Sequence, residues 1–179
     1  MHTERSRDAR ALLINGTVGV GKTTVAGAVG DRLADAGVSH AVLDLDWLRQ
    51  LWPAPAGDRF HFTMLLRNLR SIAANYLDAG ATRLVLAGVI ETDEQRKQLA
   101  DAVGVGLTVG RLRADPAVIQ RRLTSRHEGE PEVLRWHVDR CAELDAILVR
   151  AGVDDFTVDT STDCVTDVAA SVIRGAGWQ

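Results

Sequence analysis

An eight-residue stretch, Gly16-Thr17-Val18-Gly19-Val20-Gly21-Lys22-Thr23, constrains this chain more than any other part of its sequence. It follows the apolar residues 11–14, which are typical of a buried strand, and it precedes a segment with helical periodicity. Glycine adopts backbone conformations that other residues avoid, so the glycines permit a tight turn between the strand and the helix. The stretch fits the pattern G-x-x-x-x-G-K-[ST] of phosphate-binding loops, in the strand–loop–helix context that this pattern requires.

Each residue type in the loop suits the phosphate tail of a nucleotide. Backbone N–H groups in such a turn point at phosphate oxygens, and the N-terminus of the next helix adds partial positive charge. Lys22 supplies a positive charge for the β- and γ-phosphates, and the Thr23 hydroxyl can ligate Mg²⁺. We therefore expect ATP and Mg²⁺ as cofactors. The residues predicted to hold the nucleotide here are Gly16, Thr17, Val18, Gly19, Val20, Gly21, Lys22, Thr23 and Thr24.

Segments typical of strands and helices alternate along the rest of the chain. The strands are expected at residues 11–14, 41–45, 83–88, 107–112 and 156–159. The helices are expected at residues 24–36, 60–79, 92–103, 115–125, 132–150 and 165–174, the last of them capped by Asp163. This alternation predicts an α/β fold of three layers, in which a parallel five-stranded sheet is covered by helices on both faces. Ligands of such sheets bind beyond the carboxyl ends of the strands.

The composition limits the classes of protein that this chain could represent. It has 179 residues, of which 46% are hydrophobic, so we expect a flexible tail at 1–10 and one domain at 11–179. A net charge of −3 does not favour nucleic-acid binding, and no run of 18 apolar residues predicts a membrane span. Cys141 and Cys164 lack metal-ligand spacing and are expected to be reduced thiols of a cytoplasmic protein, either a monomer or a homodimer.

Two carboxylates, Asp44 and Asp46, end the second expected strand. Phosphoryl transfer to an alcohol needs a carboxylate that orients the hydroxyl or accepts its proton, and an acidic group near Mg²⁺. The third expected strand ends without the aspartate that usually anchors the metal, so Asp44 is the candidate second ligand beside Thr23. The alternative is a pair of solvated carboxylates with no chemical role.

A basic face is expected near the end of the fourth long helix. Arg122 and Arg126 are four residues apart and share that face, whereas Arg121 points elsewhere. Two guanidinium groups before a polar loop suit a short lid near 125–131 that closes on the triphosphate. An exposed basic surface is the alternative. Thr160, after the last strand, is a candidate contact for the base or ribose, or an ordinary capping residue.

The acceptor side is less defined by the sequence. Arg49 and the aromatic residues Trp47, Trp52 and Phe60, with His61, flank a proline-rich break and could form an acceptor pocket. For the aromatic residues, packing in the core is the favoured interpretation. Glu91 is a candidate contact to the acceptor or to water on Mg²⁺, or else an acidic residue that starts a helix.

Nearly the whole chain resembles the small P-loop kinases of the adenylylsulfate kinase, shikimate kinase and gluconate kinase group, and chloramphenicol phosphotransferases are similar at this level. The matching segments are Gly16–Thr23, Leu43–Asp46 with Arg49, Ala114–Pro116, Arg122–Arg126 and Val158–Ser161. The resemblance implies that Asp44 lies on the metal side and that Asp46 meets the acceptor hydroxyl. It also implies that Arg122 and Arg126 act as lid arginines, one near adenine and one on the phosphates.

The resemblance and the residues together predict an ATP-dependent phosphotransferase that moves the γ-phosphoryl group to a hydroxyl of a small molecule. Its catalytic residues would be Lys22, Asp46 and Arg126, with Arg49 and Glu91 beside the acceptor. Two alternatives stay open. One is a nucleotide-dependent ATPase or switch module without an acceptor, and the other is a polynucleotide 5′-kinase.

Overall fold

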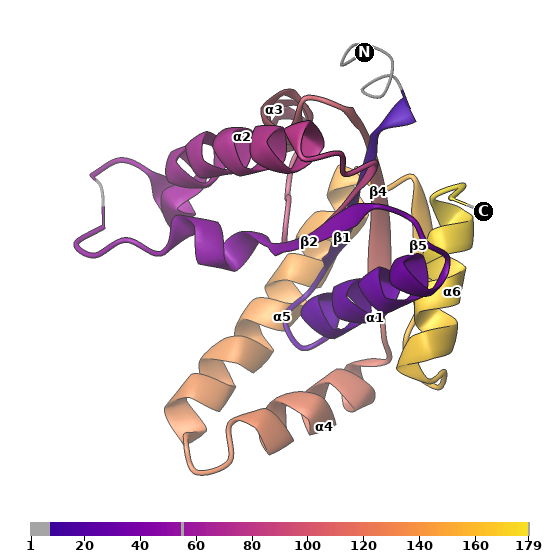
Figure 1. The fold of residues 1–179 in the computed structure, drawn as a ribbon. Helices are drawn as coiled ribbons and strands as arrows, with labels where there is room; N and C mark the ends of the chain where they lie inside the picture. The colour runs from indigo at the N-terminus through magenta and orange to yellow at the C-terminus, as the bar shows by residue number, and fades with distance from the viewer. Residues whose placement is uncertain (1–7, 55, 179) are drawn as a thin grey trace.

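A parallel sheet forms the centre of the computed structural model, which describes residues 8–54 and 56–178 (Figure 1). Its strands are β1 (Arg10–Gly16), β2 (His40–Asp44), β3 (Arg83–Ala87), β4 (Gly106–Arg113) and β5 (Phe156–Asp159). They lie in the order β2-β3-β1-β4-β5, and every pair of neighbours is parallel. β1 and β3 are buried on both faces, which is why both are continuous apolar runs in the sequence.

Helices cover both faces of the sheet, so the predicted three-layer α/β fold is confirmed. The helices α1 (Lys22–Asp35) and α6 (Val165–Gly175) pack on one face, and α2 (Phe62–Asp78) and α3 (Asp93–Val103) pack on the other. The two faces hold separate apolar clusters. One contains Leu65 and Leu69 of α2, and the other contains Val25 and Val29 of α1.

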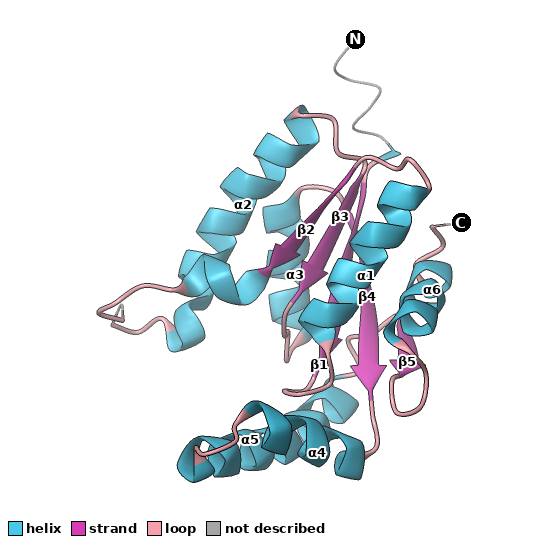
Figure 2. Ribbon diagram, turned by 60° about the horizontal axis from the view of Figure 1, so that its bottom comes forward, coloured by secondary structure: helices cyan, strands magenta, loops and turns pink. Residues whose placement is uncertain are grey.

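α4 (Pro116–Arg126) and α5 (Pro131–Ala151) form a hairpin whose turn lies beyond the carboxyl ends of the strands (Figure 2). From this turn α5 runs back along the sheet, where its Asp145 pairs with Arg111 of β4 and its Ala151 packs against the core on the α2 and α3 face (Figure 1). Asp115 begins α4 as predicted, because its side chain accepts a hydrogen bond from the Ala117 amide and Pro116 occupies the first turn. Residues 127–130 connect the two helices, at the place where the lid was predicted.

The connection from β2 to α2 extends away from the sheet (Figure 1). The short 3₁₀ helix η2 (Leu45–Arg49) follows β2 directly, and a second one, η3 (Arg59–His61), precedes α2. Asp58 stabilises the start of α2, because its carboxylate accepts hydrogen bonds from the amides of Thr63 and Met64. These bonds, the one from Thr63 above all, hold the pKa of Asp58 below its usual value.

Three local predictions differ from the structure. Arg10 belongs to β1 rather than to the tail, and residues 1–7 of the predicted tail lie outside the described residues. Asp163 does not cap α6, because Cys164 is the residue before the first turn and no side chain caps it. The aromatic residues Trp47, Trp52 and Phe60 are not in the core, since their side chains are 73%, 91% and 49% exposed.

No helix in the described part of the chain combines the length and apolar character needed to cross a bilayer.

Candidate active site

The loop between β1 and α1 has the conformation that its glycines predicted. Gly16, Gly19 and Gly21 have φ angles of 145°, 79° and 101°, which side chains other than glycine rarely allow. Two of these glycines also permit close packing. A Cβ at Gly16 would lie 2.8 Å from the carbonyl oxygen of Leu112, and one at Gly19 would lie 2.9 Å from the Leu123 side chain. The loop is therefore held tightly against β4 and α4.

The amides of this loop are free to bind an anion. Within residues 8–54 and 56–178, no group accepts a hydrogen bond from the N–H groups of residues 17–24. The last three of these amides belong to the first turn of α1, where the helix dipole also favours negative charge. A run of unsatisfied amides at a helix N-terminus is the arrangement that binds phosphate.

Lys22 is held inside the loop by backbone carbonyl groups. Its Nζ donates hydrogen bonds to the carbonyl oxygens of Gly16 at 3.0 Å and Thr17 at 2.8 Å. Burial lowers the pKa of Lys22 to about 8, although the negative charges of Asp46 and Asp44 oppose that shift. The lysine is therefore close to both carboxylates but is not locked in an ion pair with either.

Asp44 connects the loop to the end of β2. Its Oδ2 accepts a hydrogen bond of 2.7 Å from the Thr23 hydroxyl, and its Oδ1 accepts one of 2.9 Å from the Asp46 amide. The hydroxyl and the carboxylate are oxygen ligands of the kind that Mg²⁺ prefers, so the residues present fit that ion. Among the described residues, no group of three His, Cys, Asp or Glu side chains could hold a metal. Phosphate oxygens and water would have to complete the coordination of a cation here.

Asp46 is held from the side by Arg49. The guanidinium Nη2 of Arg49 lies 3.0 Å from Asp46 Oδ1, and its Nη1 donates to the carbonyl oxygen of Phe60 at 3.3 Å. His61 donates in turn to the carbonyl oxygen of Arg49 at 2.7 Å. These contacts fix η2 and the loop after it. Arg49 itself does not line the cleft described below, so its contact to an acceptor stays a prediction.

Arg122 and Arg126 both line the same cleft, as their shared helix face predicted, but they differ in their bonds. Arg122 donates to the carbonyl oxygen of Val20 and to both Thr160 oxygens, and Thr160 is itself buried. Arg122 thereby ties α4 to the loop and to the end of β5. Arg126 is exposed and has no hydrogen bond or ion pair with any described residue. Its charge contributes to lowering the pKa of Lys22, which places it near the loop.

These residues surround a cleft of about 750 Å³. Because β1 lies in the middle of the sheet, the strand order divides the wall of the cleft into two halves. One half follows β2 and β3, is called the acceptor half after the role predicted for it, and consists of Asp44, Asp46, Trp47, Gln50 and Val89. The other half follows β4 and β5, is called the nucleoside half after its predicted role, and consists of Arg122, Leu123, Arg126, Thr160, Asp163, Val165 and Val168. The phosphate-binding loop lies between the two halves, and α5 adds Trp136 and His137 to the wall.

Residues 12–143 match the family described as an AAA domain, a span that includes the loop, both carboxylates and the α4–α5 hairpin. The chain belongs to the AAA domain family. No curated protein sequence matches it significantly.

Solved structures similar to this AAA domain include enzymes named as kinases. The tunicamycin resistance protein of Deinococcus radiodurans matches with a TM-score of 0.68 and 23% identity, covering 94% of this chain and 96% of that one. Shikimate kinase from Acinetobacter baumannii, in complex with shikimate, has a TM-score of 0.63 and 19% identity, covering 97% and 96%. The Mycobacterium tuberculosis APS kinase, in complex with AMPPNP and APS, has a TM-score of 0.58 and 21% identity, covering 95% and 98%. The predicted resemblance to small P-loop kinases is confirmed.

Glu91 of this AAA domain lies outside the cleft wall and forms an ion pair with Arg140 of α5. Arg140 also pairs with Glu143, and its guanidinium lies over the Phe60 ring at 5.6 Å from the ring centre. This contact joins α5 to the loop before α2. The contact of Glu91 with an acceptor or with metal-bound water stays a prediction.

The contribution of α5 to the cleft was not predicted from the sequence. Trp136 and His137 line the wall, and the thiol of Cys141 is close enough to influence the pKa of Lys22. The spacing of His137 and Cys141 by four residues was the only sign that one face of α5 meets the site. Asn15 was also missed: its buried side chain bonds to the Gly16 amide, to Ile90 and to Asp154.

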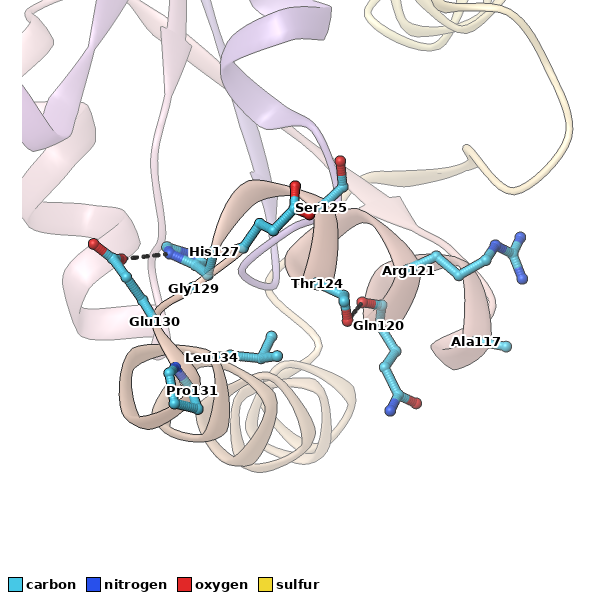
Figure 3. Close-up of a pocket in the computed structure, with 11 residues that line it drawn as sticks. Ala117, Gln120, Arg121, Thr124, Ser125, His127, Gly129, Glu130, Pro131 and Leu134 are labelled. Carbon is cyan, nitrogen blue, oxygen red and sulfur yellow. Dashed lines mark hydrogen bonds and ion pairs between the residues drawn. The ribbon is translucent and has the colours of Figure 1, made fainter.

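A larger hollow, of about 950 Å³, lies between α4 and α5 and contains no residue of the phosphate-binding loop (Figure 3). Arg121 is on its wall, which agrees with the prediction that this arginine points away from Arg122 and Arg126. His127 also lines the hollow, with Glu130 3.5 Å from its Nδ1. Its ring stacks on His137 at 4.5 Å between ring centres. The histidine pair therefore separates the hollow from the active-site cleft.

Proposed function

We propose that this chain is an ATP-dependent phosphotransferase that moves the γ-phosphoryl group to a hydroxyl of a small molecule. The observation that supports the proposal most is the run of unsatisfied amides at residues 17–24, which opens on a cleft with two distinct halves. A nucleotide needs one half, and the other half, with Asp46 at its wall, has room for a second substrate. The confirmed family and fold agree with this arrangement.

The nucleotide end would use the loop and the nucleoside half. The amides of residues 17–24 would bind the phosphates, and Lys22 would exchange its two carbonyl partners for phosphate oxygens. Thr23 and Asp44 would hold Mg²⁺, which when bound neutralises charge on the phosphates. Arg122 would support the nucleotide through the loop, because it is already bonded to Val20 and Thr160.

The acceptor end would use Asp46. The acceptor oxygen attacks the γ-phosphorus, the bond from that phosphorus to the bridging oxygen breaks, and ADP leaves. Asp46 orients the hydroxyl and takes its proton, while Arg49 holds the carboxylate in place at 3.0 Å. Lys22 and Arg126 neutralise the negative charge that develops on the transferred group. We also propose that the protein works in the cytoplasm, where its free Cys141 and Cys164 would stay reduced.

The test is acceptor-dependent transfer from ATP. Purified protein with MgATP is incubated with a library of hydroxylated metabolites and antibiotics, and ADP and phosphorylated products are measured by mass spectrometry. We expect at least one acceptor to raise ADP formation well above the rate without acceptor, with one phosphorylated product for each ADP. The Lys22→Met variant should lose both signals.

Other results would contradict the proposal in distinguishable ways. ADP formation that no acceptor stimulates, together with nucleotide-dependent binding of a protein partner, would favour an ATPase or switch module. Phosphorylation of a 5′-hydroxyl oligonucleotide, with no small acceptor active, would favour a polynucleotide kinase. Failure to bind ATP at all would remove the nucleotide site itself.

A further inference from the structure

We infer that the acceptor half of the cleft takes an uncharged alcohol with a flat apolar ring, and not an acceptor that carries a carboxylate, sulfate or phosphate. This inference rests on the proposed function and names the class of its second substrate. Two independent features carry it. One is the distribution of charge around the cleft, and the other is the exposure of aromatic side chains in its wall.

The acceptor half offers negative charge without a matching positive charge. Among the described residues of its wall, Asp44 and Asp46 are acidic, and Trp47, Gln50 and Val89 are uncharged. The cationic side chains that line the cleft are Lys22, Arg122 and Arg126, and they belong to the loop or to the nucleoside half. With nucleotide bound, Lys22 would be engaged by the phosphates and Asp44 by Mg²⁺, and Arg49 is already paired with Asp46. An anionic group on the acceptor would therefore face the Asp46 carboxylate without a free cation in this half of the wall, which costs free energy in a partly desolvated cleft.

Two arginines on the acceptor side, Arg49 and Arg140, are already paired with carboxylates. Arg49 pairs with Asp46, and its side chain is only 20% exposed. Arg140 pairs with both Glu91 and Glu143. The positive charge of each arginine is already offset by a carboxylate, so an anion beside either one would compete with that partner, and neither serves as a ready anion site.

Aromatic surface faces the same space. Trp47 follows Asp46 directly, lines the cleft and is 73% exposed, although a tryptophan usually buries its ring. Trp136 lines the cleft from α5 and is 58% exposed. It lies one helical turn before Arg140, whose contacts with Glu91 and Phe60 show that this face of α5 meets the acceptor side. Large apolar side chains left exposed in the wall of a cleft are typical of ligand-binding surface.

Polar groups in this half suit a neutral molecule. The Gln50 amide can both donate and accept a hydrogen bond, and the Asp46 carboxylate accepts one from the hydroxyl that is to be phosphorylated. His137 does not add positive charge at neutral pH, because burial and the nearby His127 and Arg126 lower its pKa. A ring stacked on Trp47 would set the hydroxyl beside Asp46.

The test compares four size-matched classes of alcohol for binding to the protein with AMPPNP and Mg²⁺, measured by ligand-observed NMR. The classes are neutral ring-bearing alcohols, neutral aliphatic polyols, ring-bearing alcohols with a carboxylate, and ring-bearing alcohols with an amine. A matched pair inside the library is N-benzoylserinamide and N-benzoylserine, which differ only in a carboxamide against a carboxylate. We expect binding to concentrate in the neutral ring-bearing class. Trp47→Ala should weaken that binding by about tenfold or more, whereas Trp47→Phe keeps most of it.

Trp52→Ala is the matched control, because Trp52 is also a highly exposed tryptophan but lies outside the cleft wall. It should bind the same alcohols as the unaltered protein, and thermal unfolding should show that all three variants are folded. Preferred binding of carboxylate-bearing, amine-bearing or aliphatic alcohols would overturn the inference. So would binding that Trp47→Ala leaves unchanged, or a library in which no class binds.

The same library separates this inference from the proposed function. Transfer from ATP is measured on every compound that binds. Neutral ring-bearing alcohols that bind but are never phosphorylated would contradict the proposed function and leave the binding site standing. Transfer to carboxylate-bearing alcohols would contradict the inference and leave the proposed function standing.

Discussion

Arg49 and Asp46 form an ion pair in which the arginine is the more buried partner, at 20% exposure against 70% for the aspartate. The two residues are three apart in η2, so the short helix that follows β2 brings them together at 3.0 Å. The contacts of Arg49 with the carbonyl oxygen of Phe60 and of His61 with the Arg49 carbonyl hold the arginine in turn. Arg49 is therefore a positioning residue that fixes the direction of the Asp46 carboxylate.

This relationship predicts coupled effects on catalysis. Asp46→Asn should lower kcat by about 10²- to 10⁴-fold, because a general base of this kind contributes that much, while the Kd of AMPPNP changes less than about twofold. Arg49→Ala should lower kcat about tenfold in the unaltered protein and by less than twofold in the Asp46→Asn background. Steady-state kinetics of the unaltered protein, the two single variants and the double variant measure this double-mutant cycle. Equal losses in both backgrounds would mean that Arg49 does not act through Asp46.

The bond between Thr23 and Asp44 predicts a change in metal dependence. Thr23→Val and Asp44→Asn should each raise the Mg²⁺ concentration for half-maximal activity by about tenfold, because each removes an oxygen that would hold the ion directly or through water. Titration of Mg²⁺ at saturating ATP measures this shift. Asp31→Asn, which removes an exposed carboxylate from α1, is the control and should not alter the titration.

The pKa of Lys22 predicts how nucleotide binding depends on pH. Because burial lowers that pKa to about 8, the free site loses its ammonium charge above pH 8 and must take up a proton when an anion binds. The Kd of AMPPNP should therefore rise by up to about tenfold per pH unit above pH 8, where the phosphates are already ionised. Calorimetric titrations between pH 7 and 10 measure the trend. Lys22→Met should bind more weakly with a flatter profile, and an equally steep profile in that variant would exclude Lys22 as its source.

The same shift has a consequence for folding. The unfolded chain binds the Lys22 proton more tightly than the folded protein does, so the contribution of this group to the free energy of unfolding increases between about pH 8, its pKa in the folded protein, and 10.5, the usual pKa of a lysine. Denaturant unfolding of the nucleotide-free protein and of Lys22→Met over that range isolates the contribution as a difference between the two curves.

The α4 helix supplies a matched pair of arginines. Arg126 lines the cleft and has no described partner, whereas Arg121 lines the separate hollow of Figure 3. Arg126→Ala should lower kcat by about a hundredfold, because a free guanidinium can stabilise charge on the transferred group. Arg121→Ala should stay within about twofold of the unaltered protein. Equal effects of the two substitutions would assign Arg126 to general surface charge.

Two glycines of α1 predict different effects of an alanine substitution on stability. A Cβ at Gly30 would lie 2.7 Å from Cγ2 of Val42, whereas one at Gly27 would meet nothing within 4 Å. Gly27→Ala should stabilise the protein by about 0.5–1 kcal/mol, since alanine is the better helix former. Gly30→Ala should be less stable than Gly27→Ala by about 1–3 kcal/mol, because the Val42 side chain or the strand that carries it must move away from the new methyl group. Urea unfolding of both variants checks this difference, and equal stabilities would show that α1 does not approach β2 so closely.

Much of the fold could be predicted because its signals are local. The apolar runs of β1 and β3 and the stripe of Val25, Val29 and Leu33 in α1 reflect burial that recurs with the period of each element. The exposure of Trp47 could not be predicted in this way, because the segment from η2 to η3 has no regular period. Without such a period, the hydrophobic character of Trp47 favours a position in the core, and the structure shows that this prediction was wrong.

The sequence by itself determined the phosphate-binding loop, the alternation of strands and helices, the place of Asp44 and Asp46 at the end of β2, and the shared face of Arg122 and Arg126 on α4. These features follow from residue types at fixed spacings, whose physical effects extend over only a few residues of the chain. Only the tertiary structure decided the strand order, and with it the two halves of the cleft. It also decided that Arg122 is bonded while Arg126 has no partner in the part of the chain that the structure describes, and that Arg140 neutralises Glu91. Such pairings join residues that are far apart in the chain. They could not be predicted from local patterns, because they form only where the packing of the whole sheet brings those residues together.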